Sequence, residues 1–218
     1  MKNGIGVITG DLYKSSIGYE RGLPYLKSME TVLKNLEHLD MFSIQQVDIF
    51  RGDFFQITLS EPAYFLDLAV YLRSHLISLS DDIEMKYDAR LSLSYSEIDL
   101  SAELKNRSYF EDAYLLSGRG LDHMPKNTMM IFSSKIEKWH KSFSGPIRLL
   151  DYIVSSLSKP QAQVLSEIII ERRINALELS KKTGKTQQNI YKLIDRGGIR
   201  QIFDFLENSR DQIHYLRR

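Results

Sequence analysis

Cysteine is absent from this chain of 218 residues, which excludes disulfides, thiol catalysis and cysteine-ligated zinc. The five histidines lack the spacing of metal ligands, so no zinc site is expected. No apolar run approaches the roughly 20 residues that cross a bilayer. A signal-peptide pattern is also missing, because Gly10, Asp11 and Lys14 interrupt any apolar stretch near the start. These absences predict a cytoplasmic protein that does not use a membrane.

The composition is that of an ordinary soluble globular protein, with 43% hydrophobic and 26% charged residues. The net charge of +1 is unevenly spread. Residues 158–218 hold 12 Lys and Arg against 7 Asp and Glu, which gives +5, whereas the preceding part holds 17 against 21, which gives −4. A basic tail on an acidic body favours contact with a polyanion, although a basic solvated face would have the same composition.

The rest of the chain is organised around a short stretch with the sequence FRGDFFQ, residues 50–56. Apolar runs flank it on both sides, and the second run alternates apolar and polar residues, as half-buried strands do. Gly52 and Asp53 suit a tight hairpin turn between two strands. The pattern therefore predicts Asp53 at the tip of a two-stranded ribbon, either as an ordinary turn residue or as part of a site.

Hydrophobic periodicity predicts eight elements up to residue 132, of which the first six follow a βαββαβ order. The expected elements are a strand at 5–9 that Gly10 and Asp11 end, a helix from about 24, the hairpin at 47–59, a helix from 61, a strand at 87–98, a helix at about 109–124 and a short strand at 128–132. This order is typical of an α+β, ferredoxin-like fold. In that topology the end of the first strand lies beside the hairpin, so Asp11 and Asp53 are expected to face each other. The alternative is that Asp11 merely caps its strand.

The strand at 87–98 has the clearest alternation in the chain. Arg90, Ser92, Ser94 and Ser96 share one face, and apolar residues share the other. The polar face is expected either to be open to water or to line a site.

Beyond Ser133 every periodic segment is helical. Ser144, Gly145 and Pro146 are expected to interrupt a helix at 135–157 and to mark a domain boundary. The predicted division is a palm-like domain at 1–143 and a small all-α domain at 144–218.

Two aspartates at neighbouring strand ends form a common type of site for a divalent cation. Hard carboxylate oxygens suit Mg²⁺ or Mn²⁺, which leave positions for water and substrate phosphates. Asp11 and Asp53 are therefore the candidate metal ligands.

Three motifs in this order resemble the SatD family: ITGDL at 8–12 with Ser15 and Ser16, RGDFFQ at 51–56, and SGRGLD at 117–122. This pattern is in turn similar to the palm of class III nucleotidyl cyclases and diguanylate cyclases. The resemblance covers roughly residues 4–132. It implies metal ligation by Asp11 and Asp53 and a catalytic, phosphate-binding role for Arg119. Arg51 is a further candidate phosphate ligand, and the alternatives are a solvent-exposed Arg51 and a salt-bridged Arg119.

Two positions depart from the cyclase pattern. Leu115 stands where the cyclases carry asparagine, and Phe54 stands where a diguanylate cyclase carries glutamate. The resemblance therefore favours the fold more than the activity.

A helix-turn-helix pattern occupies residues 176–194, ALELSKKTGKTQQNIYKLI, with Gly184 in the turn. It is similar to the DNA-binding regions of sigma-factor-like and MarR-like regulators. Amides at the start of the second helix can read adenine edges, and lysines can contact phosphates. The candidate DNA-binding residues are Lys181, Lys182, Lys185, Thr186, Gln187, Gln188, Asn189 and Lys192. The alternative is a helical bundle that serves oligomerisation.

The leading interpretation is a DNA-binding regulator, expected to be a homodimer, whose palm-like domain senses a nucleotide or supports dimerisation. The rival is an active Mg²⁺- or Mn²⁺-dependent nucleotidyl cyclase or nucleotidyltransferase. A purely structural dimer module is the third possibility.

Overall fold

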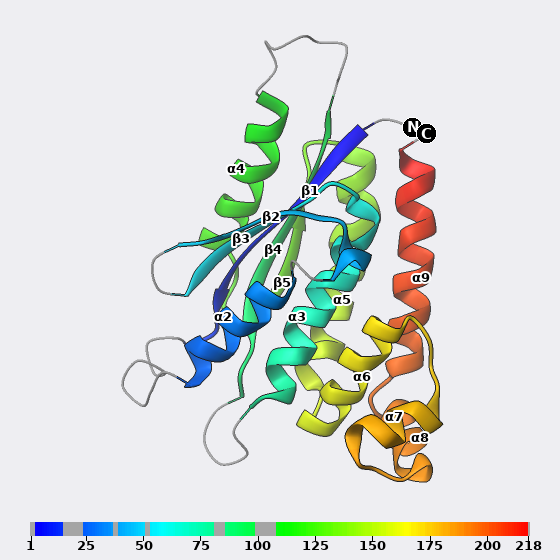
Figure 1. Ribbon diagram of the computed structural model, residues 1–218. Coiled ribbons are helices and arrows are strands. Elements are labelled where there is room, and N and C mark those ends of the chain that lie inside the picture. Colours follow the sequence, from blue (N-terminus) through cyan, green and yellow to red (C-terminus); the bar gives the residue numbers. More distant parts are fainter. Residues whose placement is uncertain are drawn as a thin grey trace.

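A computed structural model describes residues 3–14, 24–36, 39–50, 53–80, 86–98 and 108–217. These residues form a five-stranded mixed sheet and eight α-helices (Figure 1). The fold is therefore a mixture of helix and sheet, in agreement with the predicted class at that coarse level. None of the helices in the described ranges is both long and apolar enough to span a membrane.

The strands are β1 (Asn3–Leu12), β2 (Ile44–Ile49), β3 (Phe54–Leu59), β4 (Ala89–Ile98) and β5 (Met130–Ser133). Their order in the sheet is β2-β3-β1-β4-β5. β1 is antiparallel to both of its neighbours, and β5 runs parallel to β4. The central place of β1 agrees with its apolar, partly β-branched sequence, since Val7 and Ile8 are buried on opposite faces of the sheet.

The prediction that Gly10 and Asp11 end the first strand is wrong. β1 continues to Leu12, and Asp11 pairs with Phe54 of β3 and Arg90 of β4. Gly10 is needed for packing, because a Cβ there would lie 2.5 Å from the Phe55 ring and 3.0 Å from the Arg90 carbonyl oxygen. A glycine inside a strand often marks such a close approach.

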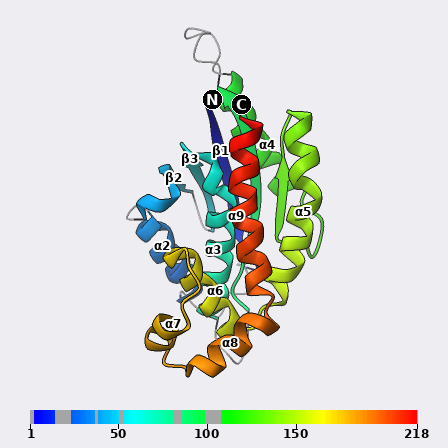
Figure 2. The ribbon, with the colours of Figure 1, turned by 90° about the vertical axis from the view of Figure 1, so that its right-hand side faces the viewer.

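The two faces of the sheet are covered differently. The helices α2 (Pro24–Leu36), α3 (Phe65–Ser78) and α5 (Glu137–Ser156) share the main hydrophobic core with the apolar face (Figures 1 and 2). Short 3₁₀ helices at Asp40–Phe42 and Pro62–Tyr64 flank the hairpin. The helix α4 (Ser108–Asp122) covers the other face, where Ser94 donates a hydrogen bond to the Ala113 carbonyl at 2.6 Å. The alternation predicted for β4 is confirmed, and α4 shields its serines from water.

The interruption expected at Ser144, Gly145 and Pro146 is wrong, since α5 runs through it without a break. An internal proline costs a helix about 3 kcal/mol. Trp139, Phe143, Ile147, Leu150 and Val154 form one buried stripe along α5, and their burial outweighs that cost. The domain division that rested on the interruption stays a prediction, and the same core continues from the sheet into α6 (Lys159–Glu171).

The last three helices form the C-terminal part of the chain. α7 (Ala176–Thr183) and α8 (Gln187–Arg196) lie at the end of the molecule farthest from the start of β1 (Figure 1). α9 (Ile199–Leu216) then returns beside α3 and α5 (Figure 2). Ion pairs from Arg210 to buried Asp67 and from Arg217 to Glu61 hold α9 in place.

Candidate functional site

The sheet brings two of the predicted site residues to one end. Asp11 lies near the end of β1, and its partner Phe54 directly follows Asp53 at the start of β3. Both aspartates are partly buried. The two side chains are close enough that the charge of Asp53 acts on the carboxyl of Asp11.

Arg90 binds Asp11 through two parallel contacts. Its Nε donates to Oδ1 of Asp11 at 2.8 Å, and its Nη2 donates to Oδ2. Burial raises the pKa of the Asp11 carboxyl above its ordinary range, the hydrogen bond and charge of Arg90 oppose that shift, and Asp53 adds to it. This pairing was missed from the sequence, where Arg90 stood out only as a cation on a serine-rich strand face.

The ion pair bears directly on the metal hypothesis. Each oxygen of Asp11 accepts one hydrogen bond from Arg90, so a cation at Asp11 would have to use the remaining lone pairs of the carboxylate or displace the guanidinium. Within the described ranges, no three histidine, aspartate or glutamate side chains are arranged to hold an ion. Ligation of a divalent cation by Asp11 and Asp53 stays a prediction.

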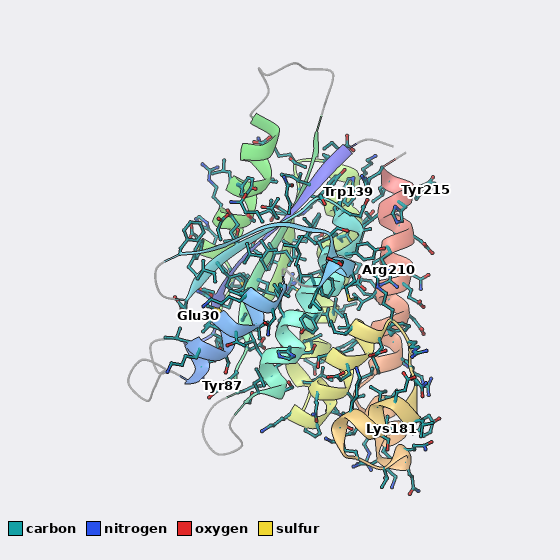
Figure 3. The ribbon with its side chains drawn as sticks, viewed as in Figure 1. Glu30, Tyr87, Trp139, Lys181, Arg210 and Tyr215 are labelled. Carbon is teal, nitrogen blue, oxygen red and sulfur yellow. The ribbon has the colours of Figure 1, made fainter. Side chains whose placement is uncertain are left out.

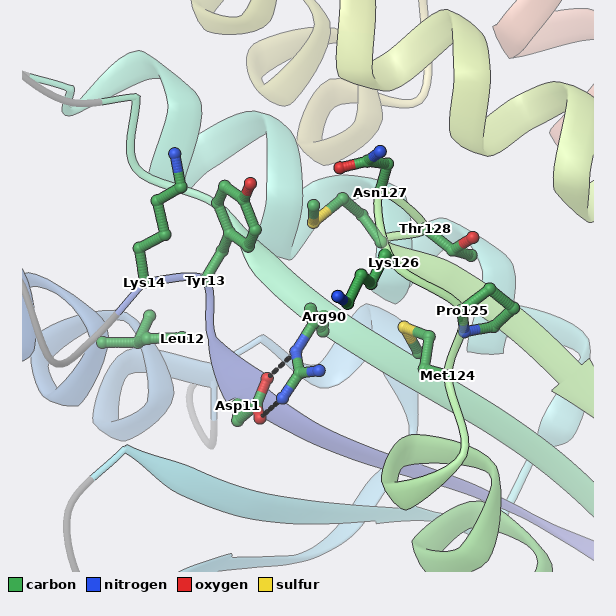
Figure 4. Close-up of a pocket in the computed structure, with 11 residues that line it drawn as sticks. Asp11, Leu12, Tyr13, Lys14, Arg90, Met124, Pro125, Lys126, Asn127 and Thr128 are labelled. Atoms are coloured by element: carbon green, nitrogen blue, oxygen red, sulfur yellow. Dashed lines mark hydrogen bonds and ion pairs between the residues drawn. The ribbon is translucent and has the colours of Figure 1, made fainter.

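A pocket of about 380 Å³ opens beside the ion pair (Figure 4). The end of β1, the start of β4 and the loop from α4 to β5 form its walls. Its lining residues are Asp11, Leu12, Tyr13, Lys14, Arg90, Met124, Pro125, Lys126, Asn127, Thr128 and Met129. Three of these carry a positive charge at neutral pH and one carries a negative charge, so the pocket is electropositive.

A buried polar network positions the walls of this pocket. The backbone N–H of Tyr13 donates to the Asp88 carbonyl at 2.9 Å, and the N–H of Met129 donates to Oδ2 of Asp151 at 3.1 Å. The fully buried Arg73 of α3 joins the two aspartates, at 2.8 Å from Asp88 and 2.7 Å from Asp151. Hydrogen bonds thus tie both walls of the pocket to a buried polar network.

The two predicted phosphate-binding arginines are placed differently. Arg119 is exposed in the last turn of α4 and does not line the pocket. Its neighbour Ser117 points into the sheet and lies 2.7 Å from the Thr9 hydroxyl. Arg51, together with Gly52, Ser15 and Ser16, lies outside the described residues.

The helix-turn-helix pattern yields two short helices joined by a tight turn. Gly184 ends α7 with a φ of 68°, a conformation that glycine adopts at little cost. Thr186 caps α8 by accepting a hydrogen bond from the Asn189 N–H at 3.2 Å. Ile190 and Ile194 are the buried residues on the inner face of α8.

The predicted DNA-binding residues divide into two groups. Lys182 contacts Glu167 at 3.1 Å and Glu171 at 2.5 Å, and Lys185 contacts Gln163 at 2.8 Å. Lys182 is nevertheless exposed, as are the remaining residues: Lys181, which Figure 3 shows at the outer end of the molecule, and Thr186, Gln187, Gln188, Asn189 and Lys192. Tyr191 and Arg196 are also exposed on α8. Tyr191 lies four residues after Gln187, and Arg196 lies four residues after Lys192. This helical spacing could have identified both as further candidate DNA-binding residues from the sequence.

No protein-family model, curated protein or solved structure matches this chain.

Proposed function

We propose that this protein is a DNA-binding transcriptional regulator of the SatD type, which contacts duplex DNA through α7 and α8. One observation carries the proposal. The first turn of α8 presents Gln187, Gln188 and Asn189 to solvent, while the opposite face of the same helix is fixed by buried isoleucines. A helix supported in this way, after a short turn, is suited to enter a major groove.

The exposed side chains have the chemistry that duplex recognition needs. Glutamine and asparagine amides pair with the adenine edge, which supplies sequence discrimination. Lys181 and Lys192 are exposed cations for phosphates, and Lys182 can join them by exchanging its glutamate partners. Operators with two half-sites would match a homodimer, the expected assembly.

The test is fluorescence anisotropy with a pool of random duplexes, followed by selected sequences, over a range of salt concentrations. We expect Lys192→Met to weaken binding similarly for all sequences and to reduce the salt slope by about 1. Gln188→Ala should cost about 1–3 kcal/mol and relax the preference at one base pair, because one amide contact is lost.

Lys141→Met is the matched control, since Lys141 is an exposed lysine of α5 that pairs with Glu137 at 2.5 Å. It should leave duplex binding unchanged. Duplex binding that is independent of salt, or equal in Lys192→Met and Lys141→Met, would refute the proposal.

The sheet supports a palm-like identity for the first part of the chain. The order β2-β3-β1-β4, with β1 antiparallel to both neighbours, is the arrangement of a ferredoxin-like βαββαβ unit. The helices α2 and α3 share one face of it, and α4 with β5 extends it. In the proposed regulator this domain senses a nucleotide or supports dimerisation, and the last helices form a helix-turn-helix domain whose core is continuous with that of the sheet.

A metal-dependent nucleotidyl cyclase or nucleotidyltransferase is the second candidate function. The observation in its favour is the meeting of Asp11 and Asp53 at one end of the sheet. Incubation with Mn²⁺ and each nucleoside triphosphate, followed by mass spectrometry, tests it. Product that disappears in Asp53→Asn would establish the enzyme, and no product from the unmodified protein would exclude this activity under those conditions.

A further inference from the structure

The pocket beside β1 and β4 is lined by positively charged side chains from three separate parts of the chain. Lys14 follows β1, Arg90 lies on β4, and Lys126 belongs to the loop between α4 and β5. Both lysines are exposed, and neither has an acidic partner among the described residues. The carboxylate of Asp11 balances one of the three charges, which leaves the lining at +2.

Arg90 keeps hydrogen-bonding capacity despite its ion pair. Asp11 engages Nε and Nη2, and Nη1 has no acceptor within the described parts of the chain. Figure 4 shows the ion pair among the residues that line the pocket, with Lys126 on the loop that faces Arg90. Asp11 therefore orients the guanidinium and leaves one end of it free for a ligand.

The remaining lining suits the rest of a small molecule. Met124, Pro125 and Met129 supply an apolar wall, and Asn127 and Thr128 supply polar groups beside it. The volume of about 380 Å³ lies within the range of small-molecule sites, about 300–1,000 Å³.

We propose that this pocket binds a small molecule that carries a phosphate or diphosphate group, with Lys14, Arg90 and Lys126 contacting its oxygens directly. Arginine and lysine side chains that line one pocket from separate elements suit a group with several anionic oxygens. Because the protein supplies the positive charge, binding needs no divalent cation. The site deepens the proposed function, in which the palm-like domain senses a nucleotide, and for that role it rests on that function. It involves neither the surface of α8 nor metal ligation by Asp11 and Asp53.

Isothermal titration calorimetry of the full chain in EDTA tests the proposal, with pyrophosphate and ATP as probes and citrate as a carboxylate control. We expect both phosphate probes to bind more tightly than citrate. Lys14→Met and Lys126→Met should each weaken the binding by about tenfold, because each removes one charge-assisted contact. Lys141→Met, which removes an exposed lysine outside the pocket, should change the affinity by less than about twofold.

Circular dichroism will confirm that each variant is folded, which is expected because both pocket lysines are exposed. Three results would overturn the proposal: neither probe binds at millimolar concentration, binding requires added Mg²⁺, or the pocket variants bind as tightly as Lys141→Met. A failure here would leave duplex binding by α8 untouched, since the two experiments use different ligands and different surfaces.

Discussion

Replacing Arg73 by methionine is expected to lower the free energy of unfolding by about 3–5 kcal/mol. The guanidinium is fully buried on α3 and binds Asp88 at 2.9 and 2.8 Å, Asp151 at 2.7 Å and Ser155 at 2.8 Å. Burial by itself would favour the neutral form, but Asp88 and Asp151 raise the pKa of Arg73, so it stays charged. Methionine would leave two carboxylates in the core without their cation. Urea denaturation measures the loss.

Arg148→Met is the control for this experiment, because Arg148 is an exposed arginine on α5. It should change the free energy of unfolding by less than about 0.5 kcal/mol. Adding Asp88→Asn and Asp151→Asn to Arg73→Met should recover part of the stability, since neutral amides cost less to bury than carboxylates. A loss below about 1 kcal/mol in Arg73→Met would mean that the buried triad does not stabilise the fold as its geometry indicates.

The same triad links stability to the pocket. Asp88 accepts from the Tyr13 N–H and Asp151 accepts from the Met129 N–H, and both donors belong to residues that line the pocket. Arg73 is not among the residues that line the pocket, so its role is to position the walls of the pocket. Ligand-binding residues are often oriented by a supporting shell of this kind.

Local patterns predicted the secondary structure well where one physical effect dominated. The alternation in β4 placed its serines and Arg90 on one face, because a strand with a single apolar face has only one favourable orientation. The strand order that carries Asp11 and Asp53 to one end followed from the sequence of elements. The turn at Gly184 followed from the requirement for a positive φ.

The parts that were missed depend on contacts between distant segments. Asp11 and Arg90 are 79 residues apart, so only the register of β1 against β4 reveals their ion pair. The continuity of α5 depends on a buried stripe that outweighs the local effect of Pro146. Arg73 did leave a signal, because it is a cation that directly follows the apolar run from Leu68 to Leu72, and a buried cation needs a partner.

Two glycines of α4 make the contact between this helix and the sheet testable. A Cβ at Gly120 would lie 2.3 Å from Oγ of Ser92 and 3.2 Å from Cδ1 of Ile131, whereas a Cβ at Gly118 would meet nothing within 4 Å. The Ser92 hydroxyl is buried and has no hydrogen-bond partner among the described residues. Gly120 thus sets how closely α4 approaches β4 and β5.

Gly120→Ala is expected to lower the free energy of unfolding by about 2 kcal/mol, because the added methyl group forces α4 away from the sheet. Gly118→Ala in the same helix should raise it by up to about 1 kcal/mol, since alanine favours the helical backbone and this position has room. Ser92→Ala should be close to neutral alone and should reduce the penalty of Gly120→Ala, because it removes the oxygen that the new methyl group meets. Thermal and urea unfolding of the four variants measure these differences. Equal effects of the two glycine substitutions would show that the close approach of α4 at Gly120 does not constrain the fold.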